Sequence, residues 1–289
     1  KETPIEKRPA AMQTVTMKAS LKYLANLDEP LVYIPSKGGG DSTDHVGNFK
    51  YRAVEIRDGR RELPSPSLDV EGFRLVRQDT AVKDFYDDAE IRTTYHAEIK
   101  ALLKKETGAV RVEIFDDTRR TSSLSQQKIK NVREPAEIIH NDYTAVSGIK
   151  RLRDHFSDDT STAERLLKKR FAIVNVWRSI AGTVQNHPLT LCDATSVSEQ
   201  DLVSVERRAD ERIGEIQVAL YNPAHRWYYF PEMKMNEALL VKTFDSATDG
   251  RTRFTIHTSV ADPGAAPDAP PRSSIETRCL LFFEEPQCA

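Results

Sequence analysis

The second half of the chain is a succession of short runs rich in β-branched and aromatic residues, each bounded by Gly, Pro, Asp or Asn. Runs of this length and composition are typical of β-strands. We expect strands at Phe171–Trp177, Leu189–Cys192, Glu215–Tyr221, Arg226–Phe230, Ala238–Phe244, Phe254–Thr258 and Ile275–Phe283. So many short strands predict a mainly β fold with peripheral helices, in which two sheets form a cupin-like double-stranded β-helix, or jelly roll.

Two segments have the features of helices. Asp87–Thr107 places Ile91, Tyr95 and Ile99 on one face, and Thr160–Arg170 opens with a Thr/Ser cap and has Glu164 at capping-box distance from Ser161. Side chains three to four residues apart share one side of a helix. We therefore expect two helices, packed outside the sheets.

We expect the 289 residues to form one domain, 1–289, and find no internal repeat. Residues 1–50 are expected to form an N-terminal arm with edge strands at Val15–Leu24 and Leu31–Ile34, and residues 110–284 the jelly-roll core that carries the site. The Gly-rich segment Lys37–Gly40 lacks the GK[ST] ending of a phosphate-binding loop, so a flexible loop is predicted there. A loop is also predicted at Ala261–Pro271.

Charge and cysteine content exclude several classes of protein. Lys and Arg total 42 against 44 Asp and Glu, a net charge of −2, which argues against general nucleic-acid binding. No apolar run is long enough to span a membrane, and the first ten residues lack the apolar core of a signal peptide. Cys192, Cys279 and Cys288 are widely spaced, which disfavours a disulfide framework and predicts a reducing, cytoplasmic location. The oligomeric state stays open.

Two histidines and an aspartate form a candidate metal site. His140 and Asp142 are two residues apart, so an extended chain points both to one side, and His257 ends a predicted strand. Two histidines and one carboxylate are the ligand set of mononuclear iron(II) oxygenases. We predict that His140, Asp142 and His257 hold Fe(II). His225 is the alternative distal ligand.

The strand that follows His257 begins with Arg272 and Ser274. Arginine offers a bidentate fork to a carboxylate, and serine can add a hydrogen bond. Together they predict the anchor of a diacid co-substrate such as 2-oxoglutarate, whose other end would chelate the metal and leave a position for O2. We favour His257 over His225 because the strand with Arg272 and Ser274 follows it. Each motif alone is common by chance, so the prediction depends on their combination.

Further residues are candidates for the wall of a substrate pocket: His225, Trp227, Tyr229, Arg178 and Asn175. Core packing is an equal alternative for the two aromatic residues, since alternate residues of a strand must face inward. A structural ion pair is the favoured alternative for Arg178. Asn175 alternates with Trp177 and could point toward the co-substrate.

Several segments resemble a known family. HNDYT, FAIVNVWRSI, PLTLCDATSV, NPAHRWYYFPEM and ALLVKTFDS resemble the gibberellin-desaturase-like family of Fe(II)/2-oxoglutarate-dependent oxygenases, which includes cephamycin-cluster oxygenases and hydroxylase/desaturases of fungal secondary metabolism. The stretch DGRTRFTIHTSV…PPRSSIETRCLLFF is similar to the distal-histidine and RxS region of 2-oxoglutarate-dependent dioxygenases. The resemblance covers roughly Val110 to Glu284. One departure is Asp117 in VEIFDDTRR, where a histidine is expected.

The resemblance implies an enzyme that hydroxylates, desaturates or cyclises a small natural product with Fe(II), 2-oxoglutarate and O2. Because one fold can host several chemistries, a non-oxidative isomerase or pericyclase on the same scaffold is the alternative. Neither a nucleic acid nor a membrane is expected as a partner.

Overall fold

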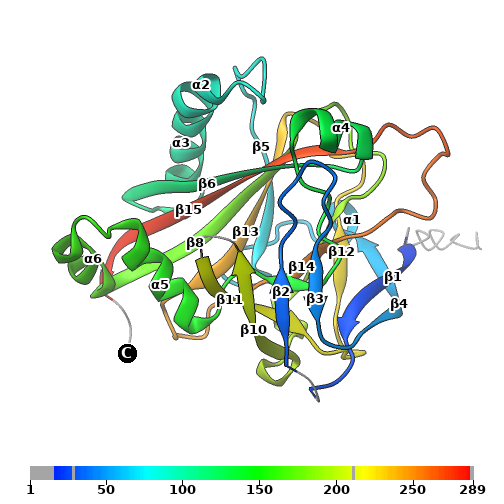
Figure 1. Ribbon diagram of the computed structural model, residues 1–289. Coiled ribbons are helices and arrows are strands. Elements are labelled where there is room, and N and C mark those ends of the chain that lie inside the picture. Colours follow the sequence, from blue (N-terminus) through cyan, green and yellow to red (C-terminus); the bar gives the residue numbers. More distant parts are fainter. Residues whose placement is uncertain (1–15, 28–29, 210–211, 287–289) are drawn as a thin grey trace, which may run out of the picture.

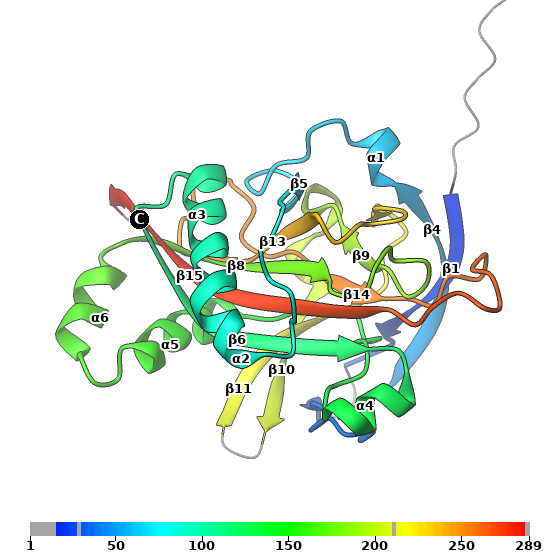
Figure 2. The ribbon, with the colours of Figure 1, turned by 90° about the horizontal axis from the view of Figure 1, so that it is seen from above.

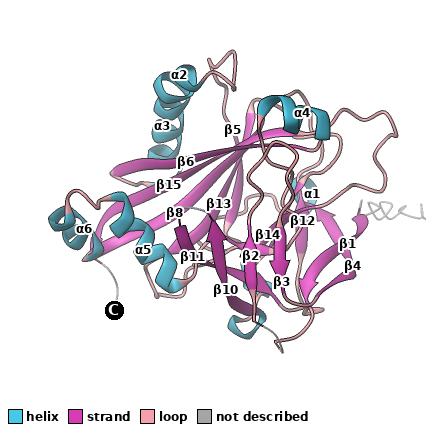
Figure 3. Cartoon of the chain, viewed as in Figure 1, coloured by secondary structure: helices cyan, strands magenta, loops and turns pink. Residues whose placement is uncertain are grey.

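Strands dominate the computed structural model, which describes residues 16–27, 30–209 and 212–286 (Figures 1 and 3). The predicted arm over residues 1–15 and Cys288 lie outside the described residues. The helices and helical turns are α1 (Gly59–Glu62), α2 (Asp88–Glu90), the π-helical turn η1 (Ile91–Tyr95), α3 (His96–Thr107), α4 (Leu124–Lys130), α5 (Ala145–His155), α6 (Thr160–Leu167), η2 (Ala194–Ser196) and η3 (Glu199–Asp201). Across the described part of the chain, none of these helices has the length and apolarity that a membrane span requires.

The larger sheet has ten strands in the order β1-β4-β12-β9-β14-β7-β11-β10-β2-β3. They are β1 (Thr16–Leu24), β2 (Val32–Ile34), β3 (Asp44–Val46), β4 (Phe49–Asp58), β7 (His140–Asn141), β9 (Leu189–Cys192), β10 (Leu202–Ala209), β11 (Arg212–Ala219), β12 (Trp227–Tyr229) and β14 (His257–Ser259). The sheet curls, because Lys22 and Leu24 of β1 also bridge to Ile138 and Leu220. The N-terminal strands β1, β2 and β3 lie toward its edges.

The smaller sheet has five antiparallel strands in the order β5-β13-β8-β15-β6. They are β5 (Phe73–Arg77), β6 (Arg111–Thr121), β8 (Lys169–Ser179), β13 (Glu237–Asp245) and β15 (Ser273–Pro286). Strand β8 is central and buried at every residue but the first. A strand covered on both faces carries near-continuous apolar sequence, which explains why this one was predictable.

The two faces of the five-stranded sheet have different partners. Its outer face packs against α3, where Ile99 and Leu103 meet Val174 and Val176 of β8 (Figure 2). Its inner face turns the alternate residues of β8, including Trp177, toward the ten-stranded sheet. Because side chains alternate along a strand, Asn175 also points inward, into the space between the sheets.

The predicted helices are observed with one correction. The helix expected over Asp87–Thr107 begins after Asp87, whose side chain accepts hydrogen bonds from the first turn, and ends where Gly108 adopts a φ of 73°. Helix α6 ends at Leu167, whereas we predicted that it continues to Arg170. Lys169 and Arg170 instead begin β8, where Lys169 is opposite Pro286 of β15.

Candidate metal centre

The three predicted metal ligands lie together between the sheets. His140 of β7 is directly opposite His257 of β14 in an antiparallel pair, and Asp142 follows β7. One ligand atom from each residue lies within 4.8 Å of the others, and the imidazole centroids of the histidines are 4.6 Å apart. His140 and His257 are buried, at 8% and 3% exposure.

Backbone hydrogen bonds fix which nitrogen of each histidine is free. Nδ1 of His140 lies 2.8 Å from the Ile138 carbonyl oxygen, and Nδ1 of His257 lies 2.9 Å from that of Thr255. A carbonyl oxygen only accepts, so each Nδ1 carries the proton and each Nε2 keeps its lone pair for a metal. Burial, and then the neighbouring His257, lower the pKa of His140 to about 3, which keeps it in the neutral form that metals bind.

The carboxylate of Asp142 is oriented by two donors on the five-stranded sheet. Its Oδ2 accepts from the Asn175 amide at 2.6 Å and from Arg278 Nε at 3.3 Å. Its Oδ1 remains on the histidine side, 3.8 Å from His140 Nε2. Burial alone would raise the pKa of Asp142, but the Arg278 guanidinium, helped by the Asn175 hydrogen bond, holds it below its usual range. Two imidazoles that present Nε2 and one ionised carboxylate on one side are a donor set that fits Fe(II).

Asn141, between two of these ligands, ties the centre to two other strands and to the segment that precedes β14. Its amide nitrogen donates to the Gln217 side chain and the Thr243 carbonyl, each at 3.0 Å, and its amide oxygen accepts from the Thr255 N–H at 3.3 Å. Thr255 is two residues before His257, so one buried amide links the segments that carry both histidines. Asn141 touches no metal-facing atom and is a positioning residue.

Arg272 is buried behind the histidines. Its Nη1 donates to the His187 carbonyl at 2.9 Å and to Ser259 Oγ at 3.2 Å, and its guanidinium lies over the Trp177 ring, 5.4 Å from the centroid. Its Nε has no hydrogen-bond partner among the described residues. A buried guanidinium without a carboxylate suits an anionic co-substrate. Ser274 lies one alternation further along β15, on the same face as Glu276.

A narrow inner cavity of about 20 Å³ joins Arg272 to the histidines. Glu276 and Arg278 line it and form an ion pair with each other. Arg278 also pairs with Asp142 and Asp116. A volume of this size holds about one water molecule, so a five-carbon diacid can enter only if the Glu276 and Arg278 side chains move.

A cleft of about 760 Å³ opens on the other side of the candidate ligands. His140 and Asp142 line it, and the Tyr33 ring stacks beside His140 at a centroid distance of 6.4 Å. Arg120, His140 and Arg278 line both the cleft and the inner cavity. The metal centre therefore separates an inner space beside Arg272 from an outer space large enough for a small molecule.

Among the predicted pocket residues, Asn175 reaches the site and the aromatic residues do not. Trp227 is fully buried, with its Nε1 donating to the Tyr23 hydroxyl at 2.7 Å. Tyr229 lines a separate depression beside Pro188. The prediction that Trp227 and Tyr229 line the pocket is therefore wrong, because β12 lies three strands away from β7 in the ten-stranded sheet.

His225 is held in a different polar cluster. Its Nδ1 lies 3.0 Å from the Tyr23 hydroxyl and its Nε2 3.1 Å from Asp201 Oδ2. Neither the metal-ligand group nor the lining of the cleft and inner cavity, as far as the chain is described, includes His225. The structure thus brings His257, and not His225, to His140 and Asp142, and the pocket role predicted for His225 is wrong.

Arg178 and Asp117 point toward the outer helix. Nη2 of Arg178 donates to the Gln78 carbonyl at 2.7 Å, and its guanidinium lies over the Tyr95 ring. The pocket role predicted for Arg178 is wrong, because strand alternation turns it away from the Asn175 side. Asp117, the departure from the family pattern, lies 2.6 Å from His96 Nε2.

Glu276 and Arg278 are site residues that the sequence argument missed, although a signal was present. Strand alternation puts them on one face with Ser274, and Arg272 precedes the same strand. A row of polar residues at every second position of an otherwise apolar strand indicates a polar interior. Trp177 could have been predicted in the same way, because it is two residues from Asn175 and so lies on the same face of β8.

Comparisons with known proteins agree with this geometry. A family profile described as an oxidoreductase/YMDC permease-like domain matches residues 21–282. The chain is 33% identical to the hydroxylase/desaturase CTB9 of Cercospora beticola, covering 82% of this chain and 78% of the relative. It is 30% identical to the hydroxylase/desaturase efuI of Hormonema carpetanum, covering 96% and 98%.

A solved structure extends the comparison to the fold. The iron and alpha-ketoglutarate-dependent endoperoxidase NvfI superposes with a TM-score of 0.80 at 27% identity, over 94% of this chain and 99% of that one. The mainly β jelly-roll fold predicted from the sequence is confirmed. The chain therefore belongs to the oxidoreductase/YMDC permease-like domain family, among the fungal Fe(II)/2-oxoglutarate-dependent hydroxylases, desaturases and dioxygenases.

Proposed function

We propose that the protein is an Fe(II)/2-oxoglutarate-dependent oxygenase that hydroxylates, desaturates or cyclises a small natural product, with His140, Asp142 and His257 as the iron ligands. The observation that carries the proposal is the convergence of three ligand atoms within 4.8 Å, with both Nδ1 atoms already bonded to carbonyls. The names of the relatives, which include hydroxylase/desaturases and dioxygenases, support the same reaction class.

In this proposal each residue has a defined task. Bound iron would couple the oxidative decarboxylation of 2-oxoglutarate by O2 to removal of hydrogen from the substrate. Arg272 and Ser274 would hold the distal carboxylate of 2-oxoglutarate. Asn175 and Arg278 fix Asp142 so that one oxygen faces the metal position. The substrate would lie in the outer cleft, where positioning beside the centre selects the bond that reacts.

Metal binding and co-substrate turnover test the proposal. Purified protein should bind one Fe(II), or one Mn(II) as a redox-silent substitute, and convert 2-oxoglutarate to succinate only with iron and O2. His257→Ala should weaken Mn(II) binding at least 100-fold, whereas His225→Ala should leave it unchanged. Equal loss in both variants would refute the ligand assignment.

The non-oxidative alternative is decided by the same assays once a substrate is found. Turnover without succinate release, undiminished by a chelator or by His140→Ala, would establish an isomerase or pericyclase instead. The ready donor set favours the oxidative reaction, because a site without a metal role has no need for two imidazoles oriented by their Nδ1 hydrogen bonds.

Finer assignments are also proposals. We place the chain in the gibberellin-desaturase-like branch on the segments quoted above, and treat residues 1–289 as one domain with its core at 110–284. A cytoplasmic location and a metabolite substrate, without nucleic-acid or membrane partners, follow from the sequence arguments. Expression of a tagged protein followed by fractionation would test the location.

A further inference from the structure

Two arginines enter the outer cleft from different walls. Arg133 lies in the segment beside the end of β6, where its carbonyl accepts from the Thr121 N–H at 2.9 Å. Arg207 is on β10, opposite Gly214 of β11 and paired with Tyr33 of β2. Both line the cleft that His140 and Asp142 also line.

Neither guanidinium has a partner in the described chain. No described residue forms a hydrogen bond or ion pair with the side chain of Arg133 or Arg207. Burial lowers the pKa of Arg133, and Arg120, Arg207 and Arg278 lower it further, with Asp116 opposing. Burial and Arg278 likewise lower the pKa of Arg207, against the influence of Tyr33, Asp142 and Tyr143. The two half-buried cations therefore repel other cations and lack a neutralising anion.

Two other arginines of the same cleft have acidic partners. Arg278 pairs with three carboxylates, including those of Asp142 and Asp116. Arg119 donates to Asp88 Oδ1 at 2.7 Å and to the Phe85 carbonyl. Arg133 and Arg207 differ from these two arginines because no described carboxylate pairs with them.

The wall beside Arg207 leaves room for a ligand. Gly214 faces Arg207 across the β10–β11 ladder, and a Cβ added there would meet nothing within 4 Å. The cleft volume of about 760 Å³ suits a small organic molecule.

Guanidinium groups bind carboxylates and phosphates through paired, charge-assisted hydrogen bonds. We propose that the substrate is an organic anion whose carboxylate or phosphate binds Arg133 and Arg207, with its carbon skeleton directed toward His140 and Asp142. This proposal rests on the proposed oxygenase function and adds the substrate class. The anionic end would set the distance of each carbon from the metal centre, and so the position of reaction.

Matched probes test the charge requirement. The probes are 2-naphthoate, methyl 2-naphthoate and 2-naphthyl phosphate, titrated calorimetrically into Mn(II)-loaded protein saturated with 2-oxoglutarate. At least one anion should bind about 10-fold more tightly than the ester, and the tighter anion identifies carboxylate or phosphate as the preferred group. Arg133→Gln and Arg207→Gln should each weaken that anion about 10-fold and leave the ester unchanged.

Arg119→Gln is the control, because it removes the same charge from the same cleft at a residue that already has a partner. It should leave every probe unchanged. The proposal is overturned if the ester binds as tightly as both anions, or if Arg119→Gln weakens the anion as much as Arg207→Gln.

A second measurement separates substrate from co-substrate. N-oxalylglycine, a 2-oxoglutarate analogue, should bind Arg133→Gln and Arg207→Gln as tightly as it binds the unmodified protein. Equal weakening of N-oxalylglycine would assign these arginines to the co-substrate and overturn the proposal. Failure of the unmodified protein to bind Mn(II) or N-oxalylglycine would instead refute the oxygenase function, whereas the acid–ester difference can still be measured.

Discussion

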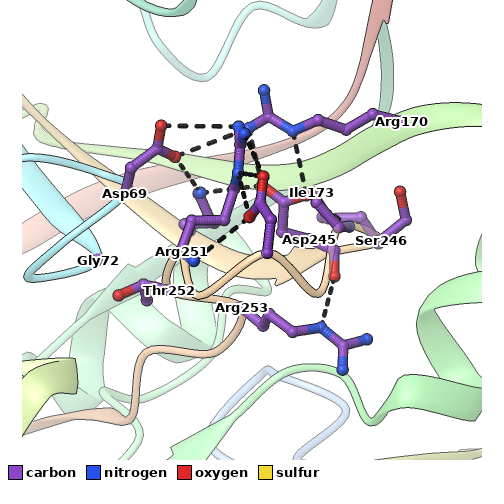
Figure 4. A network of polar contacts seen from close by, with 12 residues as sticks. Asp69, Gly72, Arg170, Ile173, Asp245, Ser246, Arg251, Thr252 and Arg253 are labelled. Atoms are coloured by element: carbon purple, nitrogen blue, oxygen red, sulfur yellow. Dashed lines mark hydrogen bonds and ion pairs between the residues drawn. The ribbon is translucent and has the colours of Figure 1, made fainter. Parts of the chain in front are cut away.

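Two groups of buried charge in this protein are built in opposite ways. Around Asp245, which is fully buried, Arg170 donates at 2.9 and 3.2 Å and Lys242 at 2.9 Å, while Asp69 and Arg251 complete the network (Figure 4). In the outer cleft, Arg133 and Arg207 have no such partner. The charges around Asp245 neutralise one another within the chain, whereas Arg133 and Arg207 are available to an anionic ligand.

Breaking the paired network should have the largest effect. Asp245→Asn keeps the shape of the side chain but leaves Arg170 and Lys242 buried without their shared carboxylate. We expect a loss of about 3–5 kcal/mol in the free energy of unfolding, measured by chemical denaturation. Glu164→Gln, which removes an exposed partner of Arg153, is the control and should leave the free energy of unfolding nearly unchanged. A similar cost for both variants would mean that the Asp245 network has no special role.

A neutral polar group gives an intermediate case. Asn141→Ala removes the amide that ties the His140 segment to Thr255 and Gln217. We expect Mn(II) affinity to fall about 10- to 100-fold, because groups that orient ligands have effects of this size. Calorimetric titration measures it. Asn141→Asp should not recover the affinity, because its second carboxylate oxygen would face the Tyr143 and Thr243 carbonyl oxygens without a donor. Unchanged affinity in Asn141→Ala would show that the ligands hold their positions without this link.

Replacing His225 tests how a buried histidine with hydrogen-bond partners contributes to stability. Burial lowers its pKa below the ordinary 6.5, although Asp201 opposes the change. Because the folded pKa is below the unfolded one, its contribution to stability is complete above about pH 6.5 and is lost as the pH falls below that value. His225→Gln should cost about 1 kcal/mol at pH 7.5 and lose less stability than the unmodified protein between pH 7.5 and 5. Parallel stability curves would contradict the assignment.

The unpaired arginines should give the smallest effect on stability. Arg207→Gln removes a cation that has no partner, so the free energy of unfolding should stay within about 0.5 kcal/mol or rise slightly. The opposite response of Arg170→Gln, a clear loss, would sharpen the contrast between the two groups. A loss above about 1 kcal/mol in Arg207→Gln would mean that this guanidinium supports the fold.

The strands predicted most accurately from the sequence are those that are completely buried. Strand β9 has the bounds predicted for it, and β8 and β13 contain theirs, because strands buried on both faces are continuously apolar. Strands β4 and β6 were missed, because their exposed faces carry charged residues that mask the pattern. Helix α5 was missed too; its capping box pairs Thr144 with Ser147 rather than with the usual acid.

Some residues of the candidate site could be predicted from the sequence and others could not. The triad and Arg272 were found because local motifs mark them. Arg133 and Arg207 carry no motif, since their significance comes from the absence of partners that distant segments could have supplied. The wrong pocket assignments of Trp227 and Arg178 have a related cause: a sequence shows which residues alternate, but not which face of a sheet encloses the site.

The direct pairing of His140 with His257 brings together two segments that are far apart in the chain. A metal held there binds only after both segments have folded against each other, so its binding energy is added to the stability of the folded state. At a free concentration 1,000 times the dissociation constant this contribution is about 4 kcal/mol. Iron supply would then govern how long the protein survives in a cell, as well as how fast it works.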